Sequence, residues 1–213
     1  MEREPLTRER ILGAALELVD EQGLEKLSMR RLGERLGVEA MSLYRYVSGK
    51  QGLLNGLHGA ILGEVRVPPG GGPWRARLRA FALEFRRVLA AHPKALPLFA
   101  TRPAVTRESL QGLEAALALL AEAGLPPTLR LSALHSLLGF VVGLSLFHFG
   151  FEVEAYVDLP APAEDFPLTT EAIRAMSDDM EEEFRFGLDA LLDGLEARAA
   201  SPGRRHRGRG ERS

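Results

Sequence analysis

The sequence predicts an all-α protein, and three observations carry that prediction. Apolar residues recur at the three- and four-residue spacing of an amphipathic helix in one segment after another. Capping residues, glycines and prolines bracket those segments. No segment shows the strict alternation of apolar and polar residues that indicates a strand. With 213 residues, 46% of them hydrophobic and 26% charged, the chain is long enough to bury a sizeable core.

The first two helices have clear ends. The first is expected to begin after the N-cap residue Thr7 and to stop at Gly23. Ser28 can cap a second helix, "SMRRLGERL", which Gly37 closes. The apolar face of each helix consists of Ile11, Leu12, Ala15, Leu16, Leu18 and Val19 in the first and of Met29, Leu32 and Leu36 in the second.

Two more helices are expected before the best boundary in the chain. A third fits residues 40–47, after a tight turn. Ser48 and Gln51 have capping-box spacing, which predicts a fourth helix that runs to about Val65. The segment "VPPGGGP" at 67–73 follows, and no helix can cross it.

Beyond that boundary the pattern is again helical. Helices are expected at about 74–91, 94–100, 106–123, 128–150 and 177–199, with a Pro-rich loop at 152–168. The last thirteen residues contain nothing apolar to bury and are expected to be disordered. The predicted parts are a DNA-binding domain at 1–66, a linker at 67–73, a ligand-binding and dimerisation domain at 74–200 and a basic tail at 201–213.

Residues 131–151 contain no charged side chain and are long enough to cross a bilayer. Histidines and serines lower the apolarity of this segment, and its flanks lack the Lys/Arg asymmetry of a membrane anchor. We therefore expect a central helix buried on nearly all sides and no membrane association. Gly139 and Gly143 form a small-xxx-small pair, which allows close approach of another helix or leaves space for a ligand.

Charge is distributed unevenly along the chain. The formal net charge is −2, yet residues 28–50 hold five basic residues against two acidic ones, and 201–213 hold five arginines against one glutamate. A concentrated basic segment suits nucleic acid, whereas the basic tail suits either phosphate contact or plain solvation. The chain has no cysteine, so disulfides and thiolate sites are excluded, and a cytoplasmic location is expected.

The helices expected at 28–36 and 40–47, with a short glycine-containing turn between them, have the proportions of a helix-turn-helix. Leu43 and Val47 are four residues apart and are expected to anchor the second of these helices inward. The remaining side chains are left to face outward, where phosphates and base edges can be contacted, namely Ala40, Met41, Ser42, Tyr44, Arg45 and Tyr46.

The run from Thr7 to Leu54, with "LSMRRLGERLGV" and "SLYRYVSGKQGLL", resembles the DNA-binding domain of the tetracycline repressor family. The segment "ATRP", a tryptophan that opens a helix at Trp74, and "FGLDALLDGLE" at 186–196 resemble the ligand-binding domain of the tetracycline repressors. The resemblance therefore covers nearly the whole chain.

The resemblance implies a set of DNA contacts. It places Ala40, Met41, Ser42, Arg45 and Tyr46 at or beside base edges, with Arg30 reaching in from the preceding helix and Ser28 at its start. Tyr44 and Lys50 match phosphate-contacting positions. Arg45 departs from the aromatic residue of the tetracycline repressors, and an arginine can read guanine. Purely structural roles remain open for these residues. Tyr44 can pack between helices, and Arg30, Arg31 and Lys50 can be solvated surface charges.

The resemblance also implies a homodimer formed by the helices at 128–150 and 177–199, and a small-molecule pocket. Its lining is expected to comprise Phe81, Phe85, Leu98, Leu117, His135, Gly139 and Phe147, although a core-only role for these residues stays open. No nucleophile elbow, phosphate loop or Glu-x-x-His pair occurs, and His135 and His148 are too far apart to chelate locally. We expect no enzyme activity, no cofactor and no bound metal.

The expected function is ligand-responsive transcriptional regulation, in which a homodimer leaves a palindromic double-stranded DNA operator when an effector binds. A helical metabolite-binding protein or enzyme with a vestigial helix-turn-helix, and DNA binding without an effector, remain alternatives. The tetracycline repressors hold a magnesium chelate with polar residues at positions that Leu98, Phe81, Ala116 and Gly139 occupy in this chain, and only the aromatic Phe85 persists. The expected effector is therefore more apolar and independent of magnesium.

Overall fold

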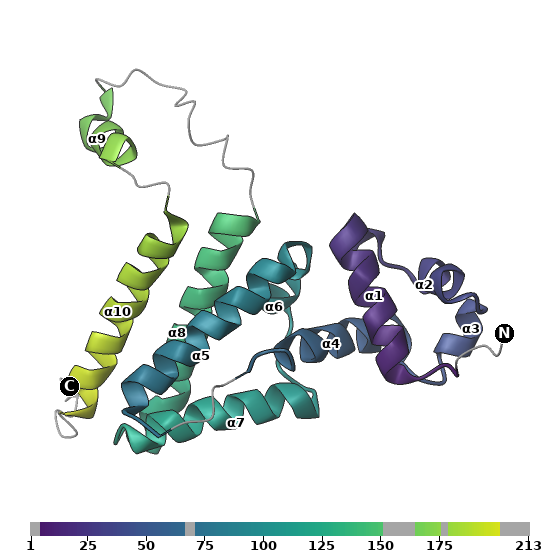
Figure 1. The fold of residues 1–213 in the computed structure, drawn as a ribbon, viewed down its shortest axis with the longest axis horizontal. Helices are drawn as coiled ribbons and strands as arrows, with labels where there is room; N and C mark the ends of the chain where they lie inside the picture. The colour runs from purple at the N-terminus through teal and green to yellow at the C-terminus, as the bar shows by residue number, and fades with distance from the viewer. Residues whose placement is uncertain (1–4, 67–70, 151–164, 176–178, 201–213) are drawn as a thin grey trace, which may run out of the picture.

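The computed structural model describes residues 5–66, 71–150, 165–175 and 179–200. This part of the chain is all-helical, which confirms the predicted fold class (Figure 1). The N-terminal elements are α1 (Arg8–Gln22), η1 (Leu24–Lys26), α2 (Met29–Leu36), α3 (Ala40–Leu43) and α4 (Gly49–Leu62). They are followed by α5 (Trp74–Ala91), η2 (Pro93–Ala95), α6 (Pro97–Thr101), α7 (Arg107–Glu122), α8 (Pro127–Phe149), α9 (Pro167–Ala175) and α10 (Met180–Ala199).

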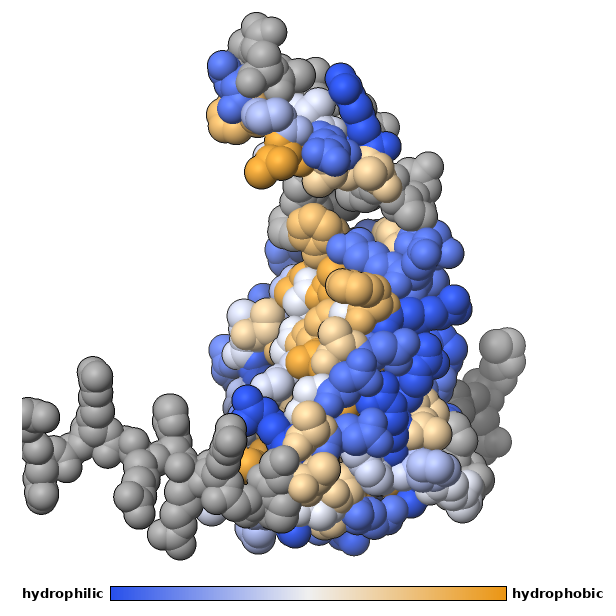
Figure 2. All heavy atoms as spheres, turned by 90° about the vertical axis from the view of Figure 1, so that its left-hand side faces the viewer, coloured by the Kyte–Doolittle hydropathy of each residue, from blue (hydrophilic) through white to orange (hydrophobic). Residues whose placement is uncertain are grey.

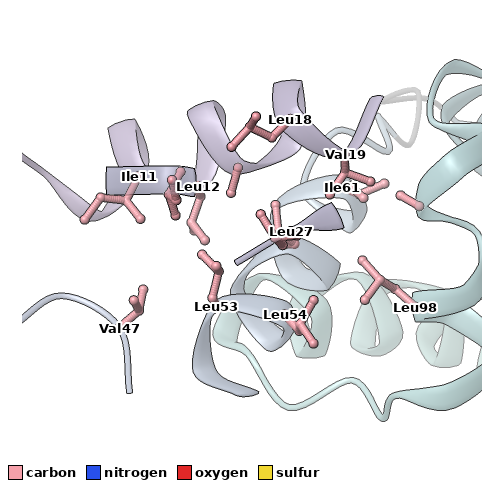
Figure 3. Packing of buried hydrophobic residues seen from close by; sticks show 14 of the residues in the cluster. Ile11, Leu12, Leu18, Val19, Leu27, Val47, Leu53, Leu54, Ile61 and Leu98 are labelled. Atoms are coloured by element: carbon pink, nitrogen blue, oxygen red, sulfur yellow. The ribbon is translucent and has the colours of Figure 1, made fainter. Parts of the chain in front are cut away.

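Helices α1–α3 form one end of the molecule, and α4 extends from them toward α5 and α7 (Figure 1). The ends of α1 and α2 are those expected, because Thr7 and Ser28 accept backbone N–H groups three residues later and Gly37 adopts the left-handed conformation. Side chains of α1, α4 and the segment after α3 converge in one core, which also receives Leu98 of α6 (Figure 3). Its fully buried members include Ile11, Leu32, Leu43, Leu53, Leu57 and Ile61.

The third helix is shorter than predicted. α3 ends at Leu43, and residues 44–46 form a turn in place of the expected helix to residue 47. The backbone tightens here, because the N–H of Tyr44 donates to Met41 O at 3.3 Å and that of Tyr46 to Leu43 O at 3.0 Å. These bonds span three residues, one fewer than in an α-helix.

The predicted capping box of α4 is wrong. The Ser48 side chain caps no backbone group, and the Gln51 side chain accepts a hydrogen bond from Arg102 Nη2 at 2.7 Å. Arg102, which is distant in the sequence, thus binds the Gln51 side chain that the capping box would need. The helix also ends at Leu62, three residues before the predicted end, in a turn closed by the N–H of Gly63.

The larger half packs α5, α7, α8 and α10 around a second apolar cluster. The helices predicted at 74–91, 106–123 and 128–150 are found within one residue as α5, α7 and α8. The segment predicted as one helix at 94–100 is divided into η2 and α6 by Leu96. α9 is not predicted from the sequence, because it begins within the expected Pro-rich loop and contains no buried residue.

Several side chains join the two halves. Val65 and Phe99 pack against both apolar clusters. His92, which follows α5, lies 2.8 Å from Asp20 Oδ2 of α1 through Nδ1 and 3.2 Å from Glu64 Oε2 through Nε2. The end of α1 is therefore tied to the end of α5 by polar as well as apolar contacts.

Several predicted features lie wholly or partly outside the described residues. They include the disordered tail at 201–213, most of the Pro-rich loop at 152–168, and residues 67–70 of the linker. The helix predicted at 177–199 is found as α10 from Met180, and residues 177–178 are not described.

Candidate functional site

The turn between α2 and α3 depends on two glycines. Gly37 has φ +67° and donates its N–H to Glu34 O at 3.2 Å. The N–H of Val38 donates to Gly33 O at 2.9 Å, and a Cβ on Gly33 would lie only 2.8 Å from Val38 O. A side chain at Gly33 would push the turn away, so glycine at this position permits the close packing of α2 against α3.

The segment from Ala40 to Val47 is anchored on one side and open on the other. Leu43 is fully buried and Val47 is 5% exposed, as their spacing predicts. Met41 is 73%, Tyr44 50% and Tyr46 39% exposed. Of the other residues predicted to contact DNA, Arg30, Arg45 and Lys50 are exposed, whereas Ser28, Ala40 and Ser42 are partly buried. We call this segment, residues 40–47, the reading segment.

The arginines of α2 are not equivalent. Arg30 is exposed and pairs with Glu34 at 3.1 Å, one turn along the same helix. Arg35 turns instead toward α1, where it pairs with Glu17 at 3.4 Å and with Glu21. The hydrogen bond from Arg35 also lowers the pKa of the Glu21 carboxyl below its ordinary value. Part of the basic charge counted in the sequence is therefore neutralised within the fold.

A cavity of about 270 Å³ lies between α4 and the helices of the larger half. Its volume is near the lower end of small-molecule sites, which are mostly apolar with a few polar groups. The lining consists of His58, Leu62, Val65, Phe81, Phe85, Phe99, Arg102, Ala104, Ser109, Gly112, Leu113, His135, Leu138 and Val142.

Three of the residues predicted to bind a ligand line this cavity, namely Phe81, Phe85 and His135. The other four lie elsewhere. Leu98 belongs to the core of α1–α4, Leu117 packs in the cluster of the larger half, and Gly139 and Phe147 are exposed on α8. The sequence did not predict that His58, Phe99, Arg102 and Ser109 line the cavity, because their positions there depend on long-range packing.

Aromatic rings dominate one part of the lining. The ring of Phe85 lies 6.4 Å from that of Phe81 and 5.7 Å from that of Phe99, measured between centroids. The imidazole of His58 lies 4.8 Å from the Phe99 ring. Such a surface favours a flat, largely apolar molecule.

The polar groups of the cavity converge on α4. His58 is 4% exposed, and its buried Nδ1 has no hydrogen-bond partner among the described residues. Burial, followed by the nearby charge of Arg102, lowers the pKa of His58, so the imidazole is neutral at neutral pH. The guanidinium of Arg102 donates to Asn55 Oδ1 and Gln51 Oε1 of α4, both at 2.7 Å.

α4 is also in tight contact with its neighbours along its length. A Cβ on Gly59 would lie 2.2 Å from Oγ1 of Thr106, the residue that caps α7. A Cβ on Gly56 would lie 2.7 Å from Cδ2 of Leu12 in α1. α4 therefore touches the cavity, the start of α7 and the core behind the reading segment, so that displacement of α4 would affect all three.

The outer face of α8 is open. From Leu131 onward, one row of exposed residues recurs at every fourth position, at Leu131, His135, Gly139, Gly143 and Phe147, with exposed Ser132 and Ser136 beside it. Figure 2 shows apolar residues gathered in a band on the side of the molecule where α8 and α10 lie, and Phe186 of α10 is 79% exposed. We call the five residues of this row the α8 stripe.

The prediction that α8 is buried on nearly all sides is wrong for a single chain. α8 is long and apolar enough to cross a membrane by length and composition, and 33% of its most apolar window is buried. The α8 stripe contributes to the difference, because its five residues are exposed in the described part of the chain. His135 also borders the cavity.

Comparison with known proteins identifies similar sequences over both halves. The model of bacterial regulatory proteins of the tetR family matches residues 11–57. The model of the tetracyclin repressor-like C-terminal domain matches residues 68–199.

Individual relatives agree with these matches. An HTH-type transcriptional regulator of Saccharopolyspora erythraea is 42% identical over 139 residues, which cover 65% of this chain and 59% of that protein. The tetracycline repressor protein class D of Escherichia coli is 34% identical over 198 residues, with 90% of this chain and 89% of the repressor covered. The structure of ActR of Streptomyces coelicolor in complex with actinorhodin has a TM-score of 0.82 at 29% identity, with 93% of this chain and 99% of ActR covered.

Proposed function

We propose the function of this chain on the basis of its family, because the chain belongs to the tetracycline repressor family of bacterial regulatory proteins. It is a ligand-responsive, DNA-binding transcriptional regulator. Within that role, we propose that it represses transcription by binding a palindromic operator and that it leaves the operator when an effector occupies the cavity. The observation that carries this proposal is the position of α4, which lines the cavity through His58 and packs against the core of the reading segment.

The reading segment is proposed to enter the major groove of the operator. The exposure of Met41, Arg45 and Tyr46 beside the buried anchors supports direct base contact by these residues. Exposed Arg30 is proposed to reach in from α2, with Ala40 and Ser42 next to the bases and Ser28 close by. Tyr44 and Lys50 are proposed to contact phosphates, and the start of α4 favours an anion there.

The effector is proposed to have a largely apolar, aromatic body. The rings of Phe81, Phe85 and Phe99 in the cavity support this. No carboxylate is among the described residues that line the cavity. A magnesium chelate would therefore exchange water for a mainly apolar surface, which is costly, and we propose that magnesium is not required.

The chain is further proposed to act as a cytoplasmic homodimer with no enzymatic activity. Regulators of this family function as dimers. The α8 stripe and the exposed Phe186 of α10 support an interface at this face, because a monomer would leave Leu131, Phe147 and Phe186 exposed to water. Residues 1–66 are proposed to form the DNA-binding domain and 74–200 the ligand-binding and dimerisation domain.

The proposal is tested by selecting bound fragments from a random DNA pool and titrating the selected duplex in gel shifts at physiological salt. We expect an inverted repeat to be enriched and to bind at least roughly a thousandfold more tightly than unrelated DNA. Aromatic compounds are then screened for release of the duplex, with tetracycline, with and without magnesium, as a separate arm. Equal affinity for all duplexes would refute the proposal that the protein binds a specific operator. Magnesium-dependent release by tetracycline would refute only the proposed effector class.

A further inference from the structure

Arg102 carries a positive charge for which the described residues supply no counter-charge. Its Nη1 and Nη2 donate to the side-chain oxygens of Asn55 and Gln51, which are neutral carboxamides. Among the described residues no carboxylate lies within ion-pair distance of Arg102, whereas five of the other ten arginines at 74–200 are paired with Asp or Glu. The guanidinium also lines the cavity.

His58 lines the same cavity and is incompletely hydrogen-bonded. The side chain is 4% exposed, and its buried Nδ1 has no partner among the described residues. A buried imidazole without a partner loses its hydrogen bonds to water without replacement. Since burial and the charge of Arg102 lower the pKa of His58, the ring is neutral and carries one N–H that it can donate to an acceptor.

We propose that the effector carries an acidic group beside its aromatic body, and that Arg102 and His58 bind this group as an anion. The inference rests on the proposed function and adds to it the chemical class of the ligand. An anion would provide the counter-charge that the described residues do not supply to Arg102, with a charge-assisted hydrogen bond that is shorter and stronger than one to a neutral amide. The apolar remainder of the ligand would lie against Phe81, Phe85 and Phe99.

The same contact gives the ligand a way to act on α4. Gln51 and Asn55 are one turn apart on α4 and precede His58 by two turns or less. An anion that draws Arg102 toward itself competes with both carboxamides and loosens the connection between α6 and α4. Because α4 packs in the core behind the reading segment, this competition couples occupancy of the cavity to DNA affinity.

The test compares aromatic acids with their neutral carboxamides, which have nearly the same shape. The probes are 2-naphthoate against 2-naphthamide and 2-anthroate against 2-anthramide, titrated into the full chain by calorimetry at neutral pH. We expect each acid to bind at least roughly tenfold more tightly than its amide. Acids that bind the wild-type protein no more tightly than the amides, or do not bind, overturn the proposal.

The variant Arg102→Gln is expected to abolish the difference between acid and amide, while leaving the affinity for the amide unchanged. Arg107→Gln is the matched control, since it removes the same charge from an exposed arginine nearby that does not line the cavity. A preference for acids that survives in Arg102→Gln contradicts the assignment of the site. If this variant fails to fold, the comparison of acid and amide affinities for the wild-type protein still tests the proposal.

Operator release separates this inference from the function on which it rests. Acids that bind in preference to amides but release no selected duplex would overturn the proposed effector response and support the anion site. Release of the duplex by a neutral compound, with acids bound no more tightly than amides, would support the response and overturn the anion site.

Discussion

Arg45 and Lys50 are both exposed and basic, yet they are expected to contribute to DNA binding in different ways. Arg45 projects from the reading segment, where an arginine can contact a guanine edge, whereas Lys50 lies in the first turn of α4. Arg45→Ala should cost roughly 1–3 kcal/mol for the selected operator and relax the preference at one base pair of each half-site. Lys50→Ala should weaken binding to all duplexes equally and reduce the salt dependence.

Gel shifts at several salt concentrations, with the operator and with single-base variants, distinguish the two effects. If Arg45→Ala kept the full preference at every position of the half-site, direct base reading by Arg45 would be excluded.

His58 predicts a pH dependence of stability. Its pKa in the folded chain lies below the ordinary value of about 6.5, so the unfolded chain binds the proton more readily. The stability that the neutral ring contributes is fully present above about pH 6.5 and is lost as the pH falls toward the lower, folded pKa. The urea midpoint of the wild-type protein should therefore fall more between pH 7.5 and 5.5 than that of His58→Phe. An equal fall in both proteins would contradict this.

Residue positions could be predicted from the sequence where the relevant contacts are local. Leu43 and Val47 share one helical face, and their inward orientation follows from a spacing of four residues. The sequence does not indicate that the charge of Arg35 is neutralised, because its partners, Glu17 and Glu21, are 18 and 14 residues away. Arg102 lies 47 residues from Asn55, so no local pattern indicates that they meet.

At the scale of elements, Gly59 sets how closely α4 approaches the start of α7. An added methyl group would lie 2.2 Å from Thr106 Oγ1 and 2.8 Å from its Cγ2, so the cap of α7 would have to move. Gly59→Ala is expected to lower the free energy of unfolding by about 1–3 kcal/mol. Gly13→Ala is the matched control in α1, where nothing lies within 4 Å of the new methyl, and should raise stability by roughly 0.5–1 kcal/mol.

Urea unfolding of both variants measures these changes. A Gly59→Ala protein as stable as the Gly13→Ala protein would mean that the contact between α4 and α7 is loose.

Elements with strong local signals were predicted well, and those that depend on tertiary contacts were not. α5 begins at Trp74 after a proline and ends at Ala91, as expected. Ser48 and Gln51 have capping-box spacing, but Arg102 takes the Gln51 side chain. α9 begins at a proline after a Pro-rich segment and buries nothing, so its sequence resembles that of a loop.

At the scale of the whole molecule, the α8 stripe predicts where two chains meet. Gly139 and Gly143 lie in the middle of the stripe, and a Cβ on either would meet no other element of the described chain within 4 Å. A second helix can therefore approach closely, and in a twofold dimer each substitution would appear on both sides of the interface. Gly143→Leu should raise the dimer dissociation constant at least roughly tenfold without affecting the monomer fold.

Sedimentation equilibrium measures this constant, and circular dichroism checks the helix content. Gly13→Leu, on the exposed surface of α1, is the control for a new leucine. A monomeric wild-type protein would show that there is no such interface. An unchanged dissociation constant for the Gly143→Leu dimer would place the interface elsewhere.

Val65 and Phe99, which pack against both apolar clusters, have a consequence for how the protein melts. Side chains shared by two cores make the loss of one core costly to the other, so calorimetry should record a single heat-capacity peak. Phe99→Ala should separate this peak into two, with the half that contains α1–α3 melting first. Because Phe99 also lines the cavity, a small molecule bound against its ring would raise the melting temperature of helices that it never touches.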